Sequence, residues 1–396
     1  MLQNAENNGY NLRKDTEIMK YIHELDDWPK FQWQDEMLVA SLAEVRHRQG
    51  RLIGRMEALG FRLREESVLD TLTEDVLKSS EIEGEQLDRD QVRSSIARRL
   101  GMDVAGMVPA DRTVEGVVEM MLDATQNYAR PLTGERLFDW HSALFPTGRS
   151  GMTKITVGNW RDDASGPMQV VSGPIGRESV HYQAPDAARL SREMGLFLTW
   201  FEDKKTIDLV LAAGIAHLWF VTIHPFDDGN GRIARAITDL TLARSEKSAG
   251  RFYSMSSRIM AQRKRYYEVL EATQKGSLDI TTWLQWFLSC LGGAFDQAEE
   301  TLAAILAKAR FWETINDTPL NERQRRVLNR IFDGFEGKLT STKWAKLAKC
   351  SQDTASRDID DLVLKGILVR GGAGGRSTSY DLVAIDRTER KIDPFV

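Results

Sequence analysis

The chain has 396 residues, enough for two or three domains, and its 42% hydrophobic and 28% charged content is typical of a globular protein. Its 53 basic and 58 acidic residues give a net charge of −5, which excludes a whole-protein field that attracts nucleic acid. Two cysteines exclude a disulfide framework, and the lack of a signal-peptide core or a run of membrane-spanning length predicts a cytoplasmic protein with no membrane contact.

The first hundred residues carry amphipathic helical patterns. Apolar residues at helical spacing predict one helix over 35–63 and one or two helices over 65–100. Within the second range, the segment Ser79-Ser80-Glu81-Ile82-Glu83-Gly84-Glu85 places a glycine near a helix end. Taken alone, these acidic residues predict only a solvated surface.

The middle of the chain alternates helical patterns with one segment of different composition. Helices are expected over 113–128, 131–145 and 190–202, and His141 in the second should pack or hydrogen-bond. Residues 147–187 concentrate glycine, proline, serine and β-branched residues, which predicts a β-hairpin with its tip at 172–176.

The apolar run 209–223 predicts a buried central helix, and a helical pattern resumes from 233 to 242. We expect His217 to be a hydrogen-bonded core histidine, because no third ligand stands at a spacing that suits zinc. The turn between the two helices contains Gly229-Asn230-Gly231 at a helix N-terminus. Backbone N–H groups without intrahelical partners make such a terminus a binding site for phosphate.

Reactive side chains flank this turn. His224 suits general-base chemistry near neutral pH, and Asp228 is a hard oxygen ligand of the kind that binds Mg2+. Arg232 and Arg235 lie three residues apart on a helix and can reach one anion. The residues also fit the dinucleotide pattern G-x-G-x-x-A, but that pattern requires a preceding strand. A purely structural turn would explain the glycines, but not the clustering of a histidine, an aspartate and two arginines. We therefore predict a phosphate-transfer centre.

The stretch His224-Pro225-Phe226-Asp227-Asp228-Gly229-Asn230-Gly231-Arg232-Ile233-Ala234-Arg235 resembles the Fic signature H-P-F-x-[DE]-G-N-G-R-x-x-R at every specified position. The resemblance implies a protein adenylyltransferase, which moves AMP from ATP to a Ser, Thr or Tyr hydroxyl of a target protein. It implies His224 as the catalytic base and Asp228 as the Mg2+ ligand. It also implies the following ATP-binding residues: Asp228, Gly229, Asn230, Gly231, Arg232 and Arg235.

Ser79, Glu83 and Gly84 resemble the inhibitory motif [ST]-x-x-x-E-[GN] of the same family. The resemblance implies an N-terminal inhibitory helix whose Glu83 pairs with Arg235 and excludes the γ-phosphate of ATP. The chemistry is sound, because a carboxylate resembles a phosphate oxygen towards guanidinium. An alternative role for Glu83 is to orient water for the removal of AMP.

The predicted hairpin resembles the family's flap, which aligns a target segment by strand addition, and Gly158-Asn159-Trp160-Arg161 matches a family turn. The resemblance implies nucleotide contacts from the flap and from a later helix, at Val180, His181, Tyr182, Tyr266, Tyr267 and Gln274. Relatives often carry Asn where this chain has Gln274. On the residues alone, the tyrosines would be core and His181 a surface residue. Relatives often dimerise, so a homodimer is expected.

Beyond Thr318-Pro319, helices are expected over 321–332, 340–348 and 354–364, and strands over 368–370 and 380–382. This order resembles a winged helix. Polar residues that could contact DNA are Ser351, Gln352, Thr354, Ser356, Arg357, Arg370 and Arg376. The acidic residues of the third helix oppose this: Asp353, Asp358, Asp360 and Asp361. A DNA partner and a protein partner both remain open.

The predicted fold is mainly α, with a Fic-type helical core, a β-hairpin flap and a C-terminal winged-helix domain. The expected domains are an N-terminal helical region over 1–110, a catalytic core over 111–315 and the winged helix over 316–396. The alternative function is a DNA-binding transcriptional regulator whose Fic core senses nucleotides. Donors other than ATP also remain open, since the signature contacts phosphates more than bases.

Overall fold

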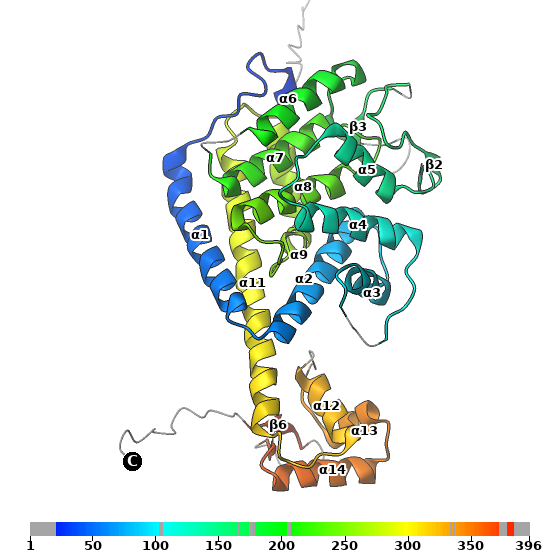
Figure 1. The fold of residues 1–396 in the computed structure, drawn as a ribbon, viewed down its shortest axis with the longest axis vertical. Helices are drawn as coiled ribbons and strands as arrows, with labels where there is room; N and C mark the ends of the chain where they lie inside the picture. Colours follow the sequence, from blue (N-terminus) through cyan, green and yellow to red (C-terminus); the bar gives the residue numbers. More distant parts are fainter. Residues whose placement is uncertain are drawn as a thin grey trace, which may run out of the picture. The chain divides into compact units, whose positions relative to one another are not determined.

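The computed structural model describes residues 21–102, 106–164, 166–173, 177, 179–203, 207–332, 335, 337–371 and 378–383, without the side chains of residues 61 and 62. The chain divides into two compact units, Met1–Ala298 and Glu299–Val396. Helices dominate both units, so the prediction of a mainly α fold is confirmed (Figure 1). In the described part of the chain, no helix combines the length and the apolar character needed to cross a membrane.

The first unit is a helical assembly with short hairpins. Its helices are η1 Ile22–Glu24, α1 Asp35–Glu57, α2 Phe61–Ile82, α3 Arg89–Arg99, α4 Arg112–Gln126, α5 Gly134–Leu144, η2 Ala187–Arg189, α6 Leu190–Glu202, α7 Leu209–Ile223, α8 Asn230–Glu246, α9 Met255–Ala261, α10 Arg263–Gln274 and the start of α11 Thr281–Thr314. Its strands are β1 Arg149–Ser150, β2 Thr153–Lys154, β3 Gln169–Ser172 and β4 Ser179–Gln183.

Helices α7 and α8 pack against each other in the centre of this unit (Figure 1). Every residue of α7 from Val210 to Ile223 is buried, which confirms the predicted central helix. His217 faces inward and its ring nitrogens lie 3.0 Å from Thr238 Oγ1 and 2.9 Å from Tyr266 Oη. The prediction of a hydrogen-bonded core histidine is therefore confirmed.

The N-terminal helices differ from the prediction at one boundary. A single helix over 35–63 is wrong, because α1 ends at Glu57 and α2 begins at Phe61 after Gly60. The apolar spacing continues through this corner because both helices bury their apolar residues in the same core, so periodicity alone did not reveal the break. Helix α2 then ends at Ile82, and the chain turns at Gly84, whose φ of +87° suits glycine.

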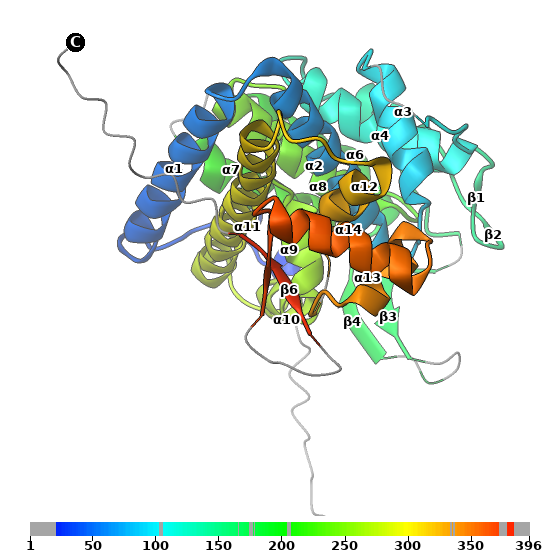
Figure 2. The same ribbon diagram turned by 90° about the horizontal axis from the view of Figure 1, so that it is seen from below.

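The hairpin β3–β4 is antiparallel, as predicted, with Gln169 opposite Gln183 and Val170 opposite Tyr182. Its inner strand β4 contacts α10, and Figure 2 shows the hairpin beside that helix. The buried Tyr182 hydroxyl donates to the carbonyl of Thr222 at 2.7 Å and so ties the hairpin to α7. The expected tip includes residues 174–176, which lie outside the described residues.

The second unit contains α12 Glu322–Phe332, α13 Ser341–Ala348, α14 Gln352–Leu364, β5 Leu368–Arg370 and β6 Tyr380–Leu382. Its core gathers around the fully buried Trp344, with Val327, Ile359 and Leu362 beside it. The expected order of helices followed by an antiparallel hairpin is present. Its assignment as a winged helix stays a prediction.

Candidate active site

The signature loop is closed by Asn230. Its side-chain oxygen accepts from Phe226 N at 3.0 Å, and its amide nitrogen donates to Phe226 O at 2.8 Å. Phe226 is fully buried and stacks on the ring of His141, with centroids 4.2 Å apart. Both Asn230 and His141 therefore hold the loop in shape. The amide of Asn230 is used inside the protein, so a phosphate contact from this residue would have to come from its backbone.

Gly229 and Gly231 leave the N-terminus of α8 accessible, because neither has a Cβ. Gly229 caps the helix with a φ of +81°, and a Cβ there would lie 2.9 Å from the ring of Phe145. A Cβ on Gly231 would lie 2.1 Å from Glu83 Oε1 and 3.3 Å from Arg235 Nη1. Glycine at this position thus lets an oxygen approach the start of the helix, and a carboxylate oxygen lies there.

His224 ends α7 in the left-handed conformation, with a φ of 50°. Its Nδ1 lies 3.3 Å from the carbonyl oxygen of Val221. Because a carbonyl oxygen only accepts, Nδ1 carries the proton and Nε2 keeps its lone pair. Burial lowers the pKa of His224 to about 4, although the hydrogen bond to Val221 O raises it, and the nearby Arg161 also lowers it. The imidazole is therefore neutral at physiological pH.

Arg161 positions the backbone on both sides of this histidine. Its Nε donates to His224 O at 2.8 Å, and its backbone N–H donates to Pro225 O at 2.9 Å. The guanidinium is buried and also pairs with Asp163 at 2.8 Å. The turn 158–161, expected beside the hairpin, thus supports the loop that carries His224.

Asp228 has the chemistry of a magnesium ligand. Its Oδ1 accepts from Gly229 N at 2.6 Å, and its Oδ2 accepts from the hydroxyl of Ser150. Each oxygen keeps a further lone pair, and Mg2+ is often bound by one or two carboxylates together with substrate phosphates. Over the described residues no group of three or more His, Cys, Asp or Glu could hold a metal. The donor set fits a magnesium ion held mainly by phosphates.

Arg235 is held by the C-terminal end of α2. Its Nε donates to Ser79 Oγ at 2.9 Å, and its Nη2 donates to Ser79 O at 2.7 Å and to Glu83 Oε1 at 2.8 Å. The guanidinium is almost completely buried. The expected pair between Glu83 and Arg235 is present, and Ser79 contributes two of the contacts.

Arg232 has a carboxylate partner that sequence reasoning missed. Its Nη1 donates to Glu85 Oε2 at 2.6 Å, and its guanidinium lies 5.1 Å from the centroid of the Phe145 ring. The side chain of Arg232 is 2% exposed, whereas that of Glu85 is 40% exposed. The acidic residue just beyond Gly84 was the available signal.

Both arginines keep an unused donor. Arg232 Nε and Arg235 Nη1 are buried and have no hydrogen-bond partner in the part of the chain that the structure describes. An unsatisfied buried N–H of a charged group is costly, so such groups are normally paired. Each guanidinium could therefore donate a hydrogen bond to a further oxyanion.

A cavity of about 800 Å³ extends from Glu83, His224 and Gly231 to the hairpin. Its wall includes Glu83, Val170, Val171, Ser172, His181, Tyr182, Val221, His224, Gly231, Arg263, Lys264, Tyr266, Tyr267, Glu268, Leu270, Glu271 and Gln274. The structure thus brings His181, Tyr182, Tyr266, Tyr267 and Gln274 to one cavity with His224. Val180 is 42% exposed and is not part of that wall.

The residues that were expected to contact the nucleotide already have partners within the protein. Gln274 Nε2 donates to Thr222 Oγ1 at 3.3 Å, while Tyr266 contacts His217. His181 Nδ1 lies 2.8 Å from Glu271 Oε2, so the expected surface histidine joins the hairpin to α10. Tyr267 lies under the guanidinium of Arg263, 5.6 Å from its ring centroid, and burial raises its pKa.

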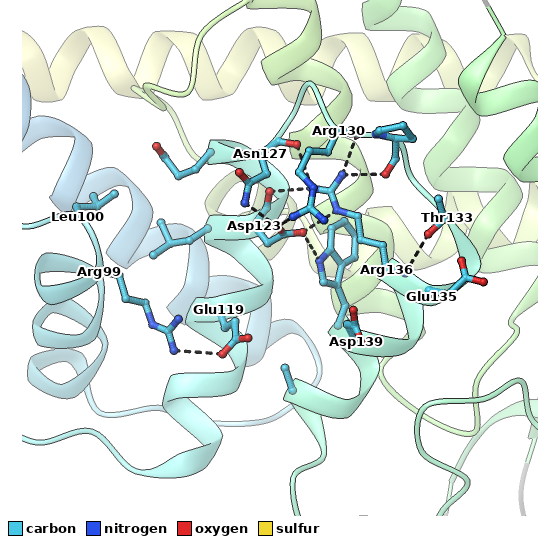
Figure 3. A pocket seen from close by; sticks show the side chains of 15 residues that line it. Arg99, Leu100, Glu119, Asp123, Asn127, Arg130, Thr133, Glu135, Arg136 and Asp139 are labelled. Carbon is cyan, nitrogen blue, oxygen red and sulfur yellow. Dashed lines mark hydrogen bonds and ion pairs between the residues drawn. The ribbon is translucent and has the colours of Figure 1, made fainter.

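A second cavity, of about 630 Å³, lies beside α4 and α5 (Figure 3). Asp123 lines it and accepts from Arg136 Nε at 2.7 Å and from Trp140 Nε1 at 2.8 Å. The other nitrogens of Arg136 donate to backbone carbonyls of Asp123, Asn127, Arg130 and Pro131. Arg136 and Asp123 are thus satisfied by each other, by Trp140 and by backbone carbonyls.

A family model described as "Fic/DOC family" matches residues 131–242, which include the hairpin and the signature loop. The chain is a Fic family protein. A second model, described as a domain of unknown function (DUF4172), matches residues 21–102 of this Fic protein, the part that carries Ser79, Glu83 and Glu85.

Curated relatives are matched over short regions. A probable protein adenylyltransferase of Aquifex aeolicus (strain VF5) is 30% identical over 81 residues, which are 20% of this chain and 23% of the relative. Protein adenylyltransferase Fic of Nematostella vectensis is 30% identical over 151 residues, 38% of this chain and 30% of the relative. The Fic protein thus spans less than a third of the length of these two relatives.

Solved structures of Fic proteins are also similar. A Fic family protein from Desulfovibrio desulfuricans G20 has a TM-score of 0.49 and 22% identity, covering 88% of this chain and 96% of that chain. Residues 134–508 of Fic-1 from C. elegans have a TM-score of 0.47 and 19% identity, covering 67% and 73% of the two chains.

Proposed function

We propose that this Fic protein is a Mg2+-dependent protein adenylyltransferase, inhibited by its own Glu83. One observation carries the proposal. A neutral histidine, His224, shares a cavity with a glycine-lined helix N-terminus at Gly231, beside two buried arginines with unused donors. Relatives that match parts of the chain are named protein adenylyltransferases, which supports the same reaction class.

His224 is the proposed base for the acceptor hydroxyl. Its Nε2 lone pair takes the proton of a target Ser, Thr or Tyr while the hydroxyl oxygen forms a bond to the α-phosphorus of ATP. The bond between that phosphorus and the bridging oxygen breaks, and pyrophosphate leaves. The hydrogen bond from Nδ1 to Val221 O keeps the ring in the tautomer that this step requires.

The start of α8 and its arginines supply the electrostatic part of the reaction. Backbone N–H groups at Gly229–Gly231 and the donors of Arg232 and Arg235 would bind the phosphates and stabilise the charge that develops on them. Phosphoryl-type transfers depend mainly on such positioning. A magnesium ion held by Asp228 would neutralise further phosphate charge when bound.

Glu83 is the proposed inhibitor, because its carboxylate lies against Gly231 and on Arg235, where a phosphate oxygen would be expected to bind. With Glu83 in this position, the triphosphate tail cannot reach Arg235. The alternative role of Glu83, activation of water for AMP removal, is tested by incubating AMP-modified protein with the wild type and with Glu83→Gly. Loss of hydrolysis in the variant would support that role.

The proposed function is tested by labelling with ATP. In a Glu83→Gly background, label in the α-phosphate should transfer to protein and label in the γ-phosphate should not. His224→Ala should lower the transfer about a hundredfold or more, the usual contribution of a general base. His47→Ala, on the exposed surface of α1, is the matched control. Undiminished transfer in His224→Ala would contradict the mechanism.

A further inference from the structure

Glu83 is not the only carboxylate on the phosphate-binding arginines, since Arg232 pairs with Glu85 at 2.6 Å. We infer that Glu85 is a second phosphate-mimicking residue, which acts with Glu83 to make the site discriminate nucleotides by their number of phosphates. The inference rests on the proposed function, because it assigns the two arginines to the outer phosphates of a nucleoside triphosphate. It extends that function from one inhibitory residue to a pair with a shared geometry.

The end of α2 holds the two carboxylates at a defined separation. Gly84 N donates to Glu81 O at 3.0 Å, and Glu85 N donates to Ser80 O at 3.0 Å. With Gly84 in the left-handed conformation, at a φ of +87°, these bonds form a Schellman motif. The motif places Glu83 just before the glycine and Glu85 just after it. One turn therefore directs one carboxylate to each arginine.

The charges of this arrangement balance in the absence of nucleotide. Arg232 and Arg235 are each 2% exposed, and a buried guanidinium without an anion would be strongly unfavourable. Glu83 and Glu85 supply one negative charge to each. Both carboxylates are only partly buried, at 29% and 40% exposure, so they can return to water when a phosphate replaces them. Each pair is thus an exchangeable anion site.

The pair predicts a preference among nucleotides. The single phosphate of a nucleoside monophosphate does not need the arginines that the carboxylates cover, so it can bind without displacing them. A triphosphate brings two more anionic groups, and these compete with both glutamates. Because Glu83 and Glu85 belong to the same turn, displacement of one disturbs the other. Because Glu85 still covers Arg232, removal of Glu83 alone should release only part of the inhibition.

The test measures nucleotide affinity by calorimetry, with AMP and with Mg–ATP as separate ligands. Glu85→Gln keeps the size of the side chain and removes its charge. It should raise ATP affinity about tenfold, the lower end for a charge-assisted hydrogen bond because Glu85 is partly exposed. AMP affinity should not change. Glu83→Gln/Glu85→Gln should exceed either single variant.

The matched control is Glu81→Gln, on the same turn. Glu81 pairs with Lys78 at 2.6 Å, away from both arginines, and its substitution should change neither affinity. Thermal unfolding checks that each variant is folded, and Glu85→Asp, which keeps the charge but shortens the side chain, should give an intermediate ATP affinity. Equal ATP affinity in Glu85→Gln, Glu81→Gln and the wild type would overturn the inference.

Binding and transfer separate the two proposals. If ATP affinity rises as expected in Glu85→Gln but no variant transfers AMP, the proposed function fails and the role of Glu85 in nucleotide selection stands. If the Glu83→Gly variant transfers AMP and Glu83→Gly/Glu85→Gln is no faster and binds ATP no more tightly, the role of Glu85 fails and the transferase stands.

Discussion

Two places in the first unit contain buried arginines in different states of hydrogen bonding. In the cavity beside α4 and α5, all three nitrogens of Arg136 are used, on Asp123 and on backbone carbonyls (Figure 3). At the signature loop, Arg232 Nε and Arg235 Nη1 are buried without a partner among the described residues. Arginines are thus buried in both places, and the difference is whether all their N–H groups have hydrogen-bond partners.

The difference distinguishes a structural ion pair from an anion-binding site. A fully satisfied buried ion pair stabilises one conformation and leaves no donor for a ligand. A guanidinium with an unused N–H and a partly exposed carboxylate partner can exchange that partner for another anion. Arg136 therefore belongs to the framework, and Arg232 and Arg235 belong to the site.

The largest expected effect comes from exchanging the two kinds of arginine for alanine. Arg136→Ala leaves the partly buried Asp123 without its main charge partner, and should lower the free energy of unfolding by about 3 kcal/mol, the lower end for a buried pair. Arg235→Ala should cost less stability, because Glu83 can turn to solvent, yet in the Glu83→Gly background it should abolish measurable ATP binding. Denaturant unfolding and calorimetry measure the two quantities. A stable Arg136→Ala protein would break the distinction.

Removal of the Glu83 carboxylate is expected to have the next largest effect. Glu83→Gly removes the carboxylate from Arg235 and from the space above Gly231, so labelling from α-phosphate-labelled ATP should rise about tenfold. The control is Glu74→Gln, which removes a carboxylate of α2 that pairs with Arg89 and not with Arg235. Equal labelling in Glu83→Gly and the wild type would show that the carboxylate does not limit the reaction.

Three histidines with lowered pKa values predict an effect of pH on stability. Burial lowers the pKa of His217 to about 3, and the pKa of His141 and of His224 to about 4. Their unfolded value is 6.5, so the unfolded chain binds more protons once the pH falls below it. Stability should therefore fall from pH 6.5 towards 4, by up to about 1.4 kcal/mol per pH unit for each histidine.

Substitution of one histidine checks this slope. His217→Gln keeps a polar group beside Thr238 and removes the titrating ring, so its unfolding free energy should depend less steeply on pH than that of the wild type. The measurement is denaturant unfolding at a series of pH values. An unchanged slope would show that His217 is not part of the acid response.

DNA binding by the second unit is expected to be the weakest effect. Asp358 pairs with Arg323 at 2.9 Å, Asp361 with Lys365 at 2.5 Å, and Asp360 with Arg370 at 2.9 Å. The acidic face is thereby partly neutralised, but Arg370 is also engaged, and Arg376 lies outside the described residues. Gel shift with genomic fragments across a salt series measures it. Tight, sequence-selective binding without AMP transfer would instead favour the regulator.

Local features of the sequence sufficed for the signature loop. The apolar run of α7 predicted its burial, and the glycines with His224, Asp228 and the arginines predicted an anion site at the start of α8. These properties depend on neighbours within a few residues, such as helix periodicity and the absence of a Cβ. The motif at Ser79 and Glu83 likewise predicted the contact with Arg235 through its resemblance to the family.

Tertiary structure alone decided which groups meet across long separations. The contact of Glu85 with Arg232 joins residues 147 positions apart, and that of Ser150 with Asp228 joins residues 78 positions apart. No local spacing encodes such pairs, because they depend on how α2 and the β1 hairpin pack against α8. The inward use of the Asn230 side chain was hidden for the same reason, since it depends on the path of the folded loop.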